Sequence, residues 1–334
     1  MKKAKTWRGQ RETLPFLLLL TFLMIIPGFT QSQPVTERVA REVRLDGIQD
    51  RPFFFKPFTL LLSPAGILVS ESGENCLKLV GTDGRLKTTI GKQGQGPDEF
   101  DTPLGLDIHD SKIYVADSFN RQVKIFSLEG KLLGNFRVEV DPVHLAVLNS
   151  ERIVVSNRPL PLGKKETILY CYDSRGGLKW QAIDPLPSAD QVYFTLINEI
   201  FLKRDDRGNI FIFHKYNGPQ ILKIDSEGKV REQIKLDPSC PVKSVELPLK
   251  SEKKRVGVAF WNVACSGDKF YLLVPDSDSR GDLGPGKEVC VIDQKGKLLE
   301  KIRFPQAIRL LATDGVTFYV LNTDDELFVY RVGP

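Results

Sequence analysis

Residues Gly91–Phe136 read GKQGQGPDEFDTPLGLDIHDSKIYVADSFNRQVKIFSLEGKLLGNF, and this stretch decides the fold. Its last part recurs along the chain as a glycine-containing turn followed by a short run of polar and apolar residues. The glycines that mark these turns are Gly84, Gly130, Gly176, Gly228 and Gly296. The first two intervals between them are 46 residues each, and the next two are 52 and 68. A repeat of about 40–50 residues built from short apolar runs is typical of the blades of a β-propeller.

Each repeat contains segments that predict four short strands. In the clearest repeat these segments cover residues 104–109, 112–117, 122–127 and 132–138. They are separated by short turns rich in Asp, Asn, Ser and Gly, which suit tight reversals of the chain. The second segment alternates apolar residues with polar or small ones, as β-strands do. The sequence therefore predicts an all-β domain over residues 31–334, a six-bladed β-propeller of four-stranded antiparallel blades.

The two ends of this domain are expected to complete one blade together. The sixth repeat has only three strand-like segments before the chain reaches Pro334. The segment Glu37–Leu45, which reads ERVAREVRL, is strand-like and precedes the first repeat. We predict that this N-terminal strand supplies the missing outer strand. Ring closure of this kind removes the exposed sheet edge that an open propeller would leave.

The first 30 residues have the layout of a secretory signal peptide. A basic start is followed by the apolar run Phe16–Ile26, and Pro27 and Gly28 then break that run. The apolar run is short for a membrane span. We therefore predict a signal peptide over residues 1–30 and export to the periplasm or the extracellular medium. The alternative is an uncleaved N-terminal anchor, which would attach the domain to a membrane.

Charge and cysteine content exclude some classes of function. Residues 1–30 hold five Lys or Arg and one Glu, which leaves 42 basic and 41 acidic residues in the rest of the chain. A nearly neutral domain has no basic excess with which to bind phosphate backbones, so nucleic acid is not expected as a partner. The five cysteines are scattered without a C-x-x-C pair, and their spacing specifies neither a disulfide nor a metal cluster.

The stretch Gly91–Phe136 resembles the NHL repeat found in six-bladed propellers. The pattern is G-x-G-P-x-E-F-x-x-P-x-G-L, followed by I-Y-V-A-D-S-x-N-x-x-V-x-I-F. It is carried by Gly94, Gly96, Pro97, Glu99, Phe100, Pro103, Gly105, Tyr114, Val115, Ala116, Asp117, Asn120, Val123, Phe126 and Gly130. The resemblance extends over residues 36–334 at low stringency. It implies a fold more strongly than an activity, because propellers include both enzymes and binding platforms. Asp117 and Asn120 are expected to stabilise a loop through local hydrogen bonds.

The resemblance also raises metal-dependent enzymes as an alternative. Some NHL-type propellers are zinc-dependent lyases of the amidating type, but His109, His144 and His214 fall at different places in the repeat. We therefore do not expect them to share one zinc ion. Gluconolactonase-like propellers are hydrolases that hold a metal at the channel mouth with Glu, Asn and Asp side chains. Glu199, Asn198 and Asn262 lie near the starts of inner strands, where they keep this possibility open.

A calcium loop is the other candidate metal site. Residues 276–282 begin like D-x-D-x-x-G, but Arg280 occupies the third ligand position, and Lys287 replaces the glutamate that closes such a loop. A polar surface loop is therefore the preferred interpretation. We predict no resident cofactor, with calcium or zinc as the alternatives.

Loop lengths point to a binding function. The first and third turns of each blade lie on one face of a propeller, and the remaining connections lie on the other. The long connections cover residues 157–166, 184–198, 237–255 and 275–287, and all belong to the second face. Loops of unequal length on one face of a rigid scaffold are a common way to build a binding site. We predict a monomeric binding or interaction module that uses this long-loop face around blades three to five.

Charged side chains on these loops form the candidate site. Its residues are Arg158, Lys164, Lys165, Lys254, Arg255, Asp276, Asp278, Arg280 and Lys287. On a nearly neutral domain they would form a basic rim beside a few carboxylates. Such a rim would attract an anionic protein surface or a carbohydrate acid. The alternative is that these charges only keep the long loops soluble.

Overall fold

The computed structural model describes residues 35–43, 53–160, 166–205, 207–216, 220–248, 253–278 and 281–333, except the side chains of residues 248, 253 and 254. Residues 35–334 form one compact unit, and the account below concerns that unit alone. The predicted signal peptide at residues 1–30 lies outside the described residues. Within the described ranges, no helix has the length and apolar character needed to cross a lipid bilayer.

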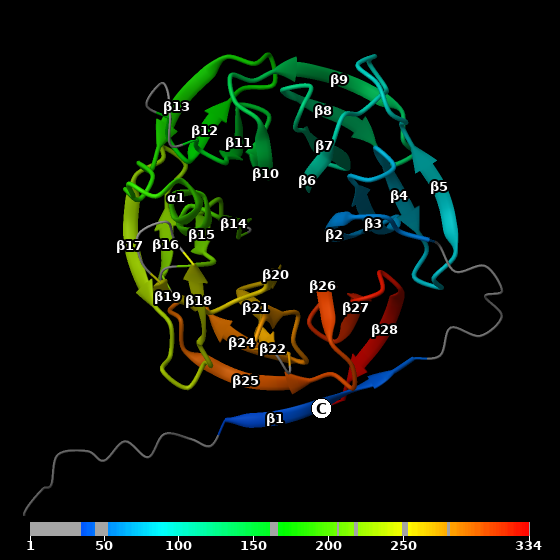
Figure 1. Ribbon diagram of the computed structural model, residues 1–334. Coiled ribbons are helices and arrows are strands. Elements are labelled where there is room, and N and C mark those ends of the chain that lie inside the picture. The colour runs from blue at the N-terminus through cyan, green and yellow to red at the C-terminus, as the bar shows by residue number, and fades with distance from the viewer. Residues whose placement is uncertain are drawn as a thin grey trace, which may run out of the picture. The chain divides into compact units, whose positions relative to one another are not determined.

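Six blades are arranged around a central axis, as Figure 1 shows in a view along that axis. Blade one holds β2 (Pro57–Ser63), β3 (Gly66–Glu71), β4 (Cys76–Val80) and β5 (Leu86–Ile90). Blade two holds β6 (Pro103–His109), β7 (Lys112–Asp117), β8 (Gln122–Ser127) and β9 (Leu132–Arg137). Blade three holds β10 (Pro142–Asn149), β11 (Arg152–Asn157), β12 (Leu169–Tyr172) and β13 (Leu178–Ala182). Blade four holds β14 (Ile200–Arg204), β15 (Ile210–His214), β16 (Gln220–Ile224) and β17 (Val230–Lys235).

The last two blades are built in the same way but share a sheet. Blade five holds β20 (Asn262–Ser266), β21 (Lys269–Leu273), β24 (Glu288–Asp293) and β25 (Leu298–Arg303). Blade six holds β26 (Ile308–Thr313), β27 (Thr317–Asn322) and β28 (Leu327–Val332). Neighbouring strands within each blade are antiparallel, and the first strand of each blade lies nearest the axis (Figure 1). The predicted six-bladed, four-stranded architecture is confirmed.

The hydrophobic core lies between neighbouring blades. One cluster of buried side chains joins blades one and two, and further clusters join each following pair. The ring is closed by a cluster that joins blade six to blade one and includes Leu321 and Val69. The middle strands are buried on both faces; all six residues of β3 are buried, for example. No blade can bury both faces of its sheet alone, so each depends on its neighbours.

The repeat glycines are explained by the turn before each outer strand. At all five positions φ lies between +78° and +85°, a region that residues with a side chain rarely adopt. These glycines are Gly84, Gly130, Gly176, Gly228 and Gly296. Space is restricted as well: a Cβ atom on Gly228 would lie 2.8 Å from the Trp180 ring of the preceding blade. The periodic glycine thus fits both a left-handed turn and a close contact between blades.

The N-terminal strand β1 (Thr36–Glu42) joins the last two blades. Residues 40–42 pair antiparallel with β28, so this part of the predicted closing strand lies where it was expected. Residues 36–39 pair in parallel with β25, the outer strand of blade five, which the sequence did not predict. Ala40 is 3% exposed and packs among core residues of blades five and six. Residues 44 and 45 of the predicted strand lie outside the described residues.

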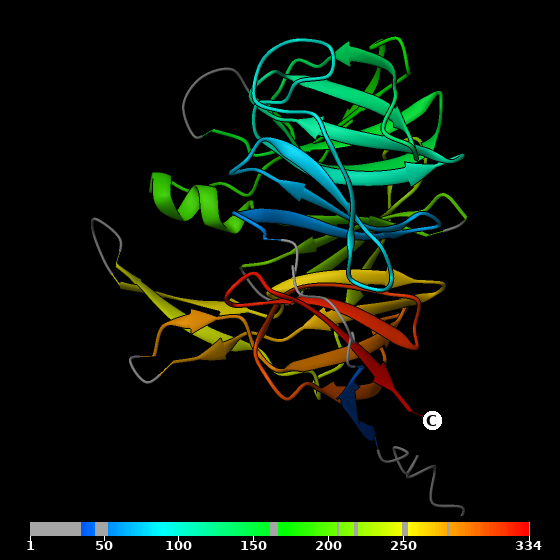
Figure 2. The same ribbon diagram turned by 90° about the vertical axis from the view of Figure 1, so that its right-hand side faces the viewer.

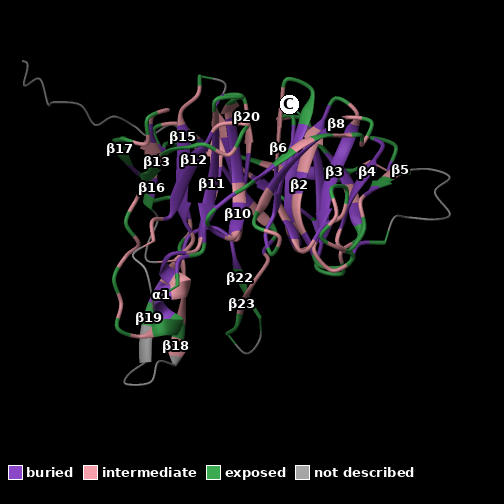
Figure 3. Ribbon diagram, turned by 90° about the horizontal axis from the view of Figure 1, so that it is seen from above, coloured by how far each residue is buried: buried purple, intermediate pink, exposed green. Residues whose placement is uncertain are grey.

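Three of the long connections contain regular structure that the sequence analysis treated as loops. Helix α1 (Gln191–Ile197) begins at Asp190, whose carboxylate accepts a hydrogen bond from the Tyr193 backbone nitrogen at 2.9 Å. Strands β18 (Lys243–Pro248) and β19 (Lys253–Val258) form a hairpin, and β22 (Asp276–Ser277) and β23 (Leu283–Gly284) form a shorter one. Figures 2 and 3 show all three elements projecting from the same face of the ring.

The helix and the longer hairpin support each other. Tyr193 and Ile197 of α1 form a small apolar cluster with Val256 of β19, and Leu247 of β18 packs against it. This contact buries apolar surface that a short helix exposed to solvent could not bury alone. The long-loop face is therefore partly built from ordered elements.

Candidate functional site

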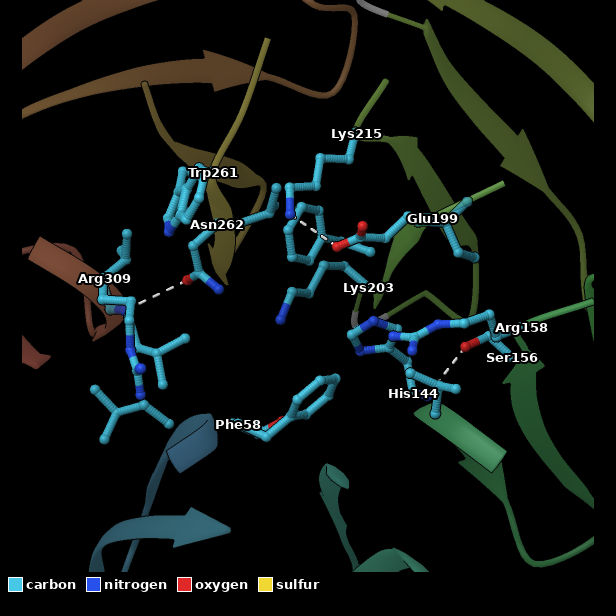
Figure 4. A pocket seen from close by; sticks show the side chains of 18 of the residues that line it. Phe58, His144, Ser156, Arg158, Glu199, Lys203, Lys215, Trp261, Asn262 and Arg309 are labelled. Carbon is cyan, nitrogen blue, oxygen red and sulfur yellow. Dashed lines mark hydrogen bonds and ion pairs between the residues drawn. The ribbon is translucent and has the colours of Figure 1, made fainter. Parts of the chain in front are cut away.

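The first cavity lies at the end of the central channel on the face that carries α1 and the two hairpins. Its volume is about 220 Å³, and it is lined by the first residues of the inner strands and by residues at the ends of the second strands. We call it the axial cavity. Lining side chains used below are Phe58, His144, Arg158, Glu199, Phe201, Lys203, Lys215, Trp261, Asn262 and Arg309 (Figure 4).

Cationic side chains dominate the axial cavity. Arg158, Lys203, Lys215 and Arg309 line it, against the single carboxylate of Glu199. Two of the four have carboxylate partners. The Lys215 ammonium lies 2.8 Å from Glu199, and the Arg309 guanidinium lies 2.7 Å from Asp325. The excess of positive charge favours an anion inside the cavity, where surrounding protein strengthens electrostatic attraction.

Lys203 extends into the axial cavity from strand β14. Figure 4 shows its side chain extending towards the middle, between Asn262 on one side and His144 on the other. The Lys203 ammonium makes no hydrogen bond or ion pair with any residue that the structure describes. Desolvation lowers the pKa of Lys203, although the Cys265 thiol and the Asp107 carboxylate oppose that shift. An anionic ligand would supply the partner that this ammonium lacks.

Aromatic rings provide apolar walls. The His144 ring lies 5.4 Å from the Phe58 ring and 5.9 Å from the Phe201 ring, measured between centroids. The Lys215 ammonium lies 4.8 Å from the centre of the Trp261 ring, a distance that fits a cation–π contact. Burial, together with the nearby charges of Lys203, Arg158 and Lys215, lowers the pKa of His144 to about 3. His144 is therefore neutral at physiological pH and adds no charge to the cavity.

A second cavity of about 460 Å³ occupies the opposite end of the channel. Lys203, Leu60 and Leu311 line both cavities, so these residues mark the level at which the two meet. In the second cavity, Arg204 is paired with Asp107, with an Nε to Oδ2 distance of 2.9 Å. The charges of Arg204 and Asp107 thus compensate each other in the second cavity. The excess of positive side chains belongs to the axial cavity, with Lys203 at its base.

The sequence-derived site residues do not gather in one place. Arg158 lines the axial cavity. Asp276 and Lys287 line a separate cavity of about 170 Å³ beside β22, together with Lys243. Arg255 lies on the hairpin strand β19 and donates a hydrogen bond to Ser244. The backbone nitrogen of Asp282 donates to the Asp278 side chain within the turn of the shorter hairpin. Lys164, Lys165 and Arg280 lie outside the described residues, as does the side chain of Lys254.

The metal-binding alternatives can be placed as well. Asn198 is buried and bonds the backbone of Leu186 and Phe194, where it anchors the end of α1. Glu199 is bound to Lys215, and the Asn262 side chain accepts a hydrogen bond from the Leu311 backbone at 3.3 Å. These three residues therefore have partners other than a metal, and four cations surround the cavity that they line. Such surroundings disfavour a divalent cation.

The three histidines occupy separate positions. His109 ends β6 beside Asp110, His144 lines the axial cavity, and His214 ends β15, where it is buried. Across the described residues, no group of three or more His, Cys, Asp or Glu side chains is placed to hold a metal ion. None of the five cysteines forms a disulfide, and Cys265 is the one that is not fully buried.

Most of the axial cavity was not predicted from the sequence. Lys203 and Arg309 lie within inner strands and Trp261 directly precedes one, in segments where apolar residues predicted only packing. Lys215 directly follows β15, the second strand of its blade. Strand registers offer one signal. They place Lys203 at the blade position held by Leu61, Ala146, Ala264 and Ala312 in four other blades, and by Asp107 in blade two. A lysine at a mostly apolar inner position could have been identified by this alignment.

Comparisons with known proteins agree with the fold. A protein-family model described as a six-bladed β-propeller matches residues 60–174, roughly a third of the chain. No curated protein sequence matches the chain. Two solved structures from Bacteroides are similar, each with a TM-score of 0.57. A candidate exported protein from Bacteroides fragilis has 9% identity over 88% of this chain and 94% of its own. A member of the DUF4221 family from Bacteroides vulgatus has 11% identity over 90% of this chain and 97% of its own.

An enzyme is also among the similar structures. A catalytically inactive variant of virginiamycin B lyase from Staphylococcus aureus, solved with quinupristin, has a TM-score of 0.52. It is 10% identical over 90% of this chain and 96% of its own. Identities this low establish a shared fold and carry no activity or ligand from one protein to the other. The chain is thus similar in fold, over 88–90% of its length, to these three bacterial structures.

Proposed function

We propose that this chain is an exported binding module that takes a small organic anion in its axial cavity. The observation that carries the proposal is the Lys203 ammonium, which projects into a cavity with four cations and one carboxylate and has no described polar partner. An ammonium in such a position is stabilised when a carboxylate or phosphate binds beside it. The expected ligand also has an apolar or flat part, because Phe58, Phe201 and Trp261 provide ring faces.

Other features support the proposal. The basic first residues and the apolar run Phe16–Ile26 favour export, and a candidate exported protein is among the similar structures. The resemblance of residues 91–136 to NHL repeats also supports a binding role, because propellers of that type include binding platforms. Helix α1 and the two hairpins stand around the same face as the axial cavity (Figure 3). Carbohydrate acids combine a carboxylate with an apolar C–H face on the sugar ring, and they therefore fit both the cations and the aromatic walls of the cavity.

Calorimetry can test this function with defined anions. The purified chain would be titrated with a panel of aromatic carboxylates, uronic acids and phosphate monoesters. We expect at least one of them to bind, with an affinity that falls as ionic strength rises. Lys203→Met should weaken that affinity about 10- to 100-fold, which corresponds to one lost charge-assisted hydrogen bond.

Two further variants separate the axial cavity from other basic surfaces. Lys131→Met alters an exposed lysine on the opposite face and should leave the affinity unchanged. Lys287→Met alters the separate cavity beside β22, and a loss there would indicate the basic rim instead. The proposal is wrong if no anion binds, or if Lys203→Met and Lys131→Met bind equally well.

A further inference from the structure

Buried lysines elsewhere in this chain show what a structural lysine looks like. Lys124 is fully buried, forms an ion pair with Asp117 at 2.9 Å, and donates hydrogen bonds to the Gly96 and Glu99 carbonyls. Lys78 is nearly buried, and it donates to the Phe53 carbonyl and forms an ion pair with Glu74. Each ammonium is held by oxygen atoms of the protein itself.

Lys203 differs from both in its surroundings. It has no hydrogen-bond or ion-pair partner among the described residues, and it faces a cavity wide enough for a ligand. Three cations lie around the neutral His144 ring, and their charges lower its pKa. They are Lys203, Arg158 and Lys215. Desolvation is one of the conditions that make a lysine amine nucleophilic. The desolvation is reflected in the lowered pKa of Lys203.

The same cavity can position a carboxylate next to this amine. Arg158 is exposed at the rim of the cavity, and its guanidinium has no ion pair with a described carboxylate. Guanidinium groups bind carboxylates through two parallel hydrogen bonds. A ligand anchored there, with its ring against Phe58 or Phe201, would extend into the space that the Lys203 amine faces.

We propose that Lys203 is a nucleophile that forms an imine with the carbonyl carbon of a small 2-keto carboxylate bound in the axial cavity. This inference rests on the proposed function, because the same cations must first bind the carboxylate. In the reaction, the amine nitrogen of Lys203 adds to the ketone carbon and gives a carbinolamine. Loss of one water molecule then forms the C=N bond, so one amine and one ketone yield one imine and one water. No oxidant or reductant is needed.

Borohydride trapping tests this directly with a matched pair of probes. Phenylglyoxylate and mandelate share an aromatic ring and a carboxylate, and they differ in a ketone against a hydroxyl group. The full chain would be incubated with each probe, treated with sodium borohydride, and examined by intact-mass and peptide mass spectrometry. Reduction of the imine adds the mass of phenylglyoxylate less one oxygen atom.

We expect one adduct with phenylglyoxylate, on the peptide that contains Lys203, and none with mandelate. Lys203→Arg should abolish the adduct, because a guanidinium does not form this imine. Lys112→Arg, which alters an exposed lysine at the start of β7, should retain it. Labelling of Lys203 should exceed that of exposed lysines such as Lys112, since the lowered pKa of Lys203 raises the neutral fraction of its amine.

The possible results separate this inference from the function on which it rests. Binding of both probes by calorimetry without an adduct at Lys203 overturns the imine and leaves anion binding intact. Failure of every anion in the earlier panel overturns both. If Lys203→Arg does not fold, competition decides: an excess of mandelate should suppress the adduct in the unaltered protein. An adduct that mandelate does not suppress, or one spread over surface lysines, also overturns the inference.

Discussion

Lys124→Met should destabilise the domain strongly, because it removes one partner of a fully buried ion pair. The Lys124 ammonium and the Asp117 carboxylate have no exposed side-chain surface and lie 2.9 Å apart. The methionine would leave Asp117 with two donors, the Asp101 backbone nitrogen and the Asn120 amide, both at 2.8 Å. The Gly96 and Glu99 carbonyls would lose the ammonium that they share. Breaking a buried pair in this way costs about 3–5 kcal/mol.

This loss translates into a measurable fall in melting temperature. For a domain of this size, 1 kcal/mol corresponds to about 2–4 °C, so the melting temperature should fall by about 6–20 °C. Desolvation already raises the pKa of Asp117, and removal of Lys124 should raise it further. An acid whose pKa is raised by folding destabilises the folded state as pH increases. The deficit of Lys124→Met should therefore be larger at about pH 8 than at about pH 5.

Urea unfolding at both pH values provides the assay, with two controls. Lys112→Met alters an exposed lysine of the same blade and should change the unfolding free energy by less than about 0.5 kcal/mol. The double variant Lys124→Met with Asp117→Asn removes both charges and should lose less stability than the sum of the single variants. A loss below about 1 kcal/mol for Lys124→Met, or strict additivity in the double variant, would refute the reasoning.

Two further predictions concern ring closure and a buried acid. Ala40→Lys places a charge in the core where β1 meets blades five and six, and it should lower the unfolding free energy by at least about 3 kcal/mol. The control Val39→Lys alters a neighbour that is 66% exposed and should lower it by less than about 0.5 kcal/mol, with both measured by urea unfolding. Equal effects would show that β1 does not close the ring. Burial raises the pKa of Glu71 from 4.5 to about 7, so the stability that its protonated form contributes should be lost as pH rises between these values. In urea unfolding measured across this pH range, Glu71→Gln should show a smaller decline in unfolding free energy than the unaltered protein, and an equal decline would contradict the prediction.

The blade pattern could be predicted from the sequence because local signals and packing agree there. The four segments expected at residues 104–138 correspond to β6, β7, β8 and β9 within one residue at each end. Their turns need glycine or Asx residues, and their middle strands are buried on both faces, so turn chemistry and alternation point to the same boundaries. The network around Asp117 and Asn120 also confirms the expected loop-stabilising role, because both side chains bond to each other and to the backbone of the Gly91–Phe136 stretch.

Helix α1 and the β18–β19 hairpin of the long-loop face were harder to predict, because each is stabilised by contacts with the other. Helix α1 has seven residues, too few to be stable alone, and it is held by contacts with the β18–β19 hairpin. Its capping residue Asp190 and the apolar residues Tyr193, Phe194 and Ile197 are a helix signal in retrospect. The surrounding segment is rich in proline and polar residues, however, and that composition favoured the prediction of a loop.

The axial cavity was missed for a different reason, which concerns how a propeller makes a site. Five of the six blades contribute residues from their inner strands, and these residues are far apart in sequence: Lys203 and Arg309 are separated by more than a hundred positions. No local motif can result from such a site, because closing the ring, and not the spacing along the chain, brings its members together. Charged loops are conspicuous in a sequence, yet two of the four cations that line this cavity, Lys203 and Arg309, come from inner strands, and the other two directly follow second strands. In a propeller, therefore, the unusual residue at an aligned inner-strand position is a better guide to function than the longest loop.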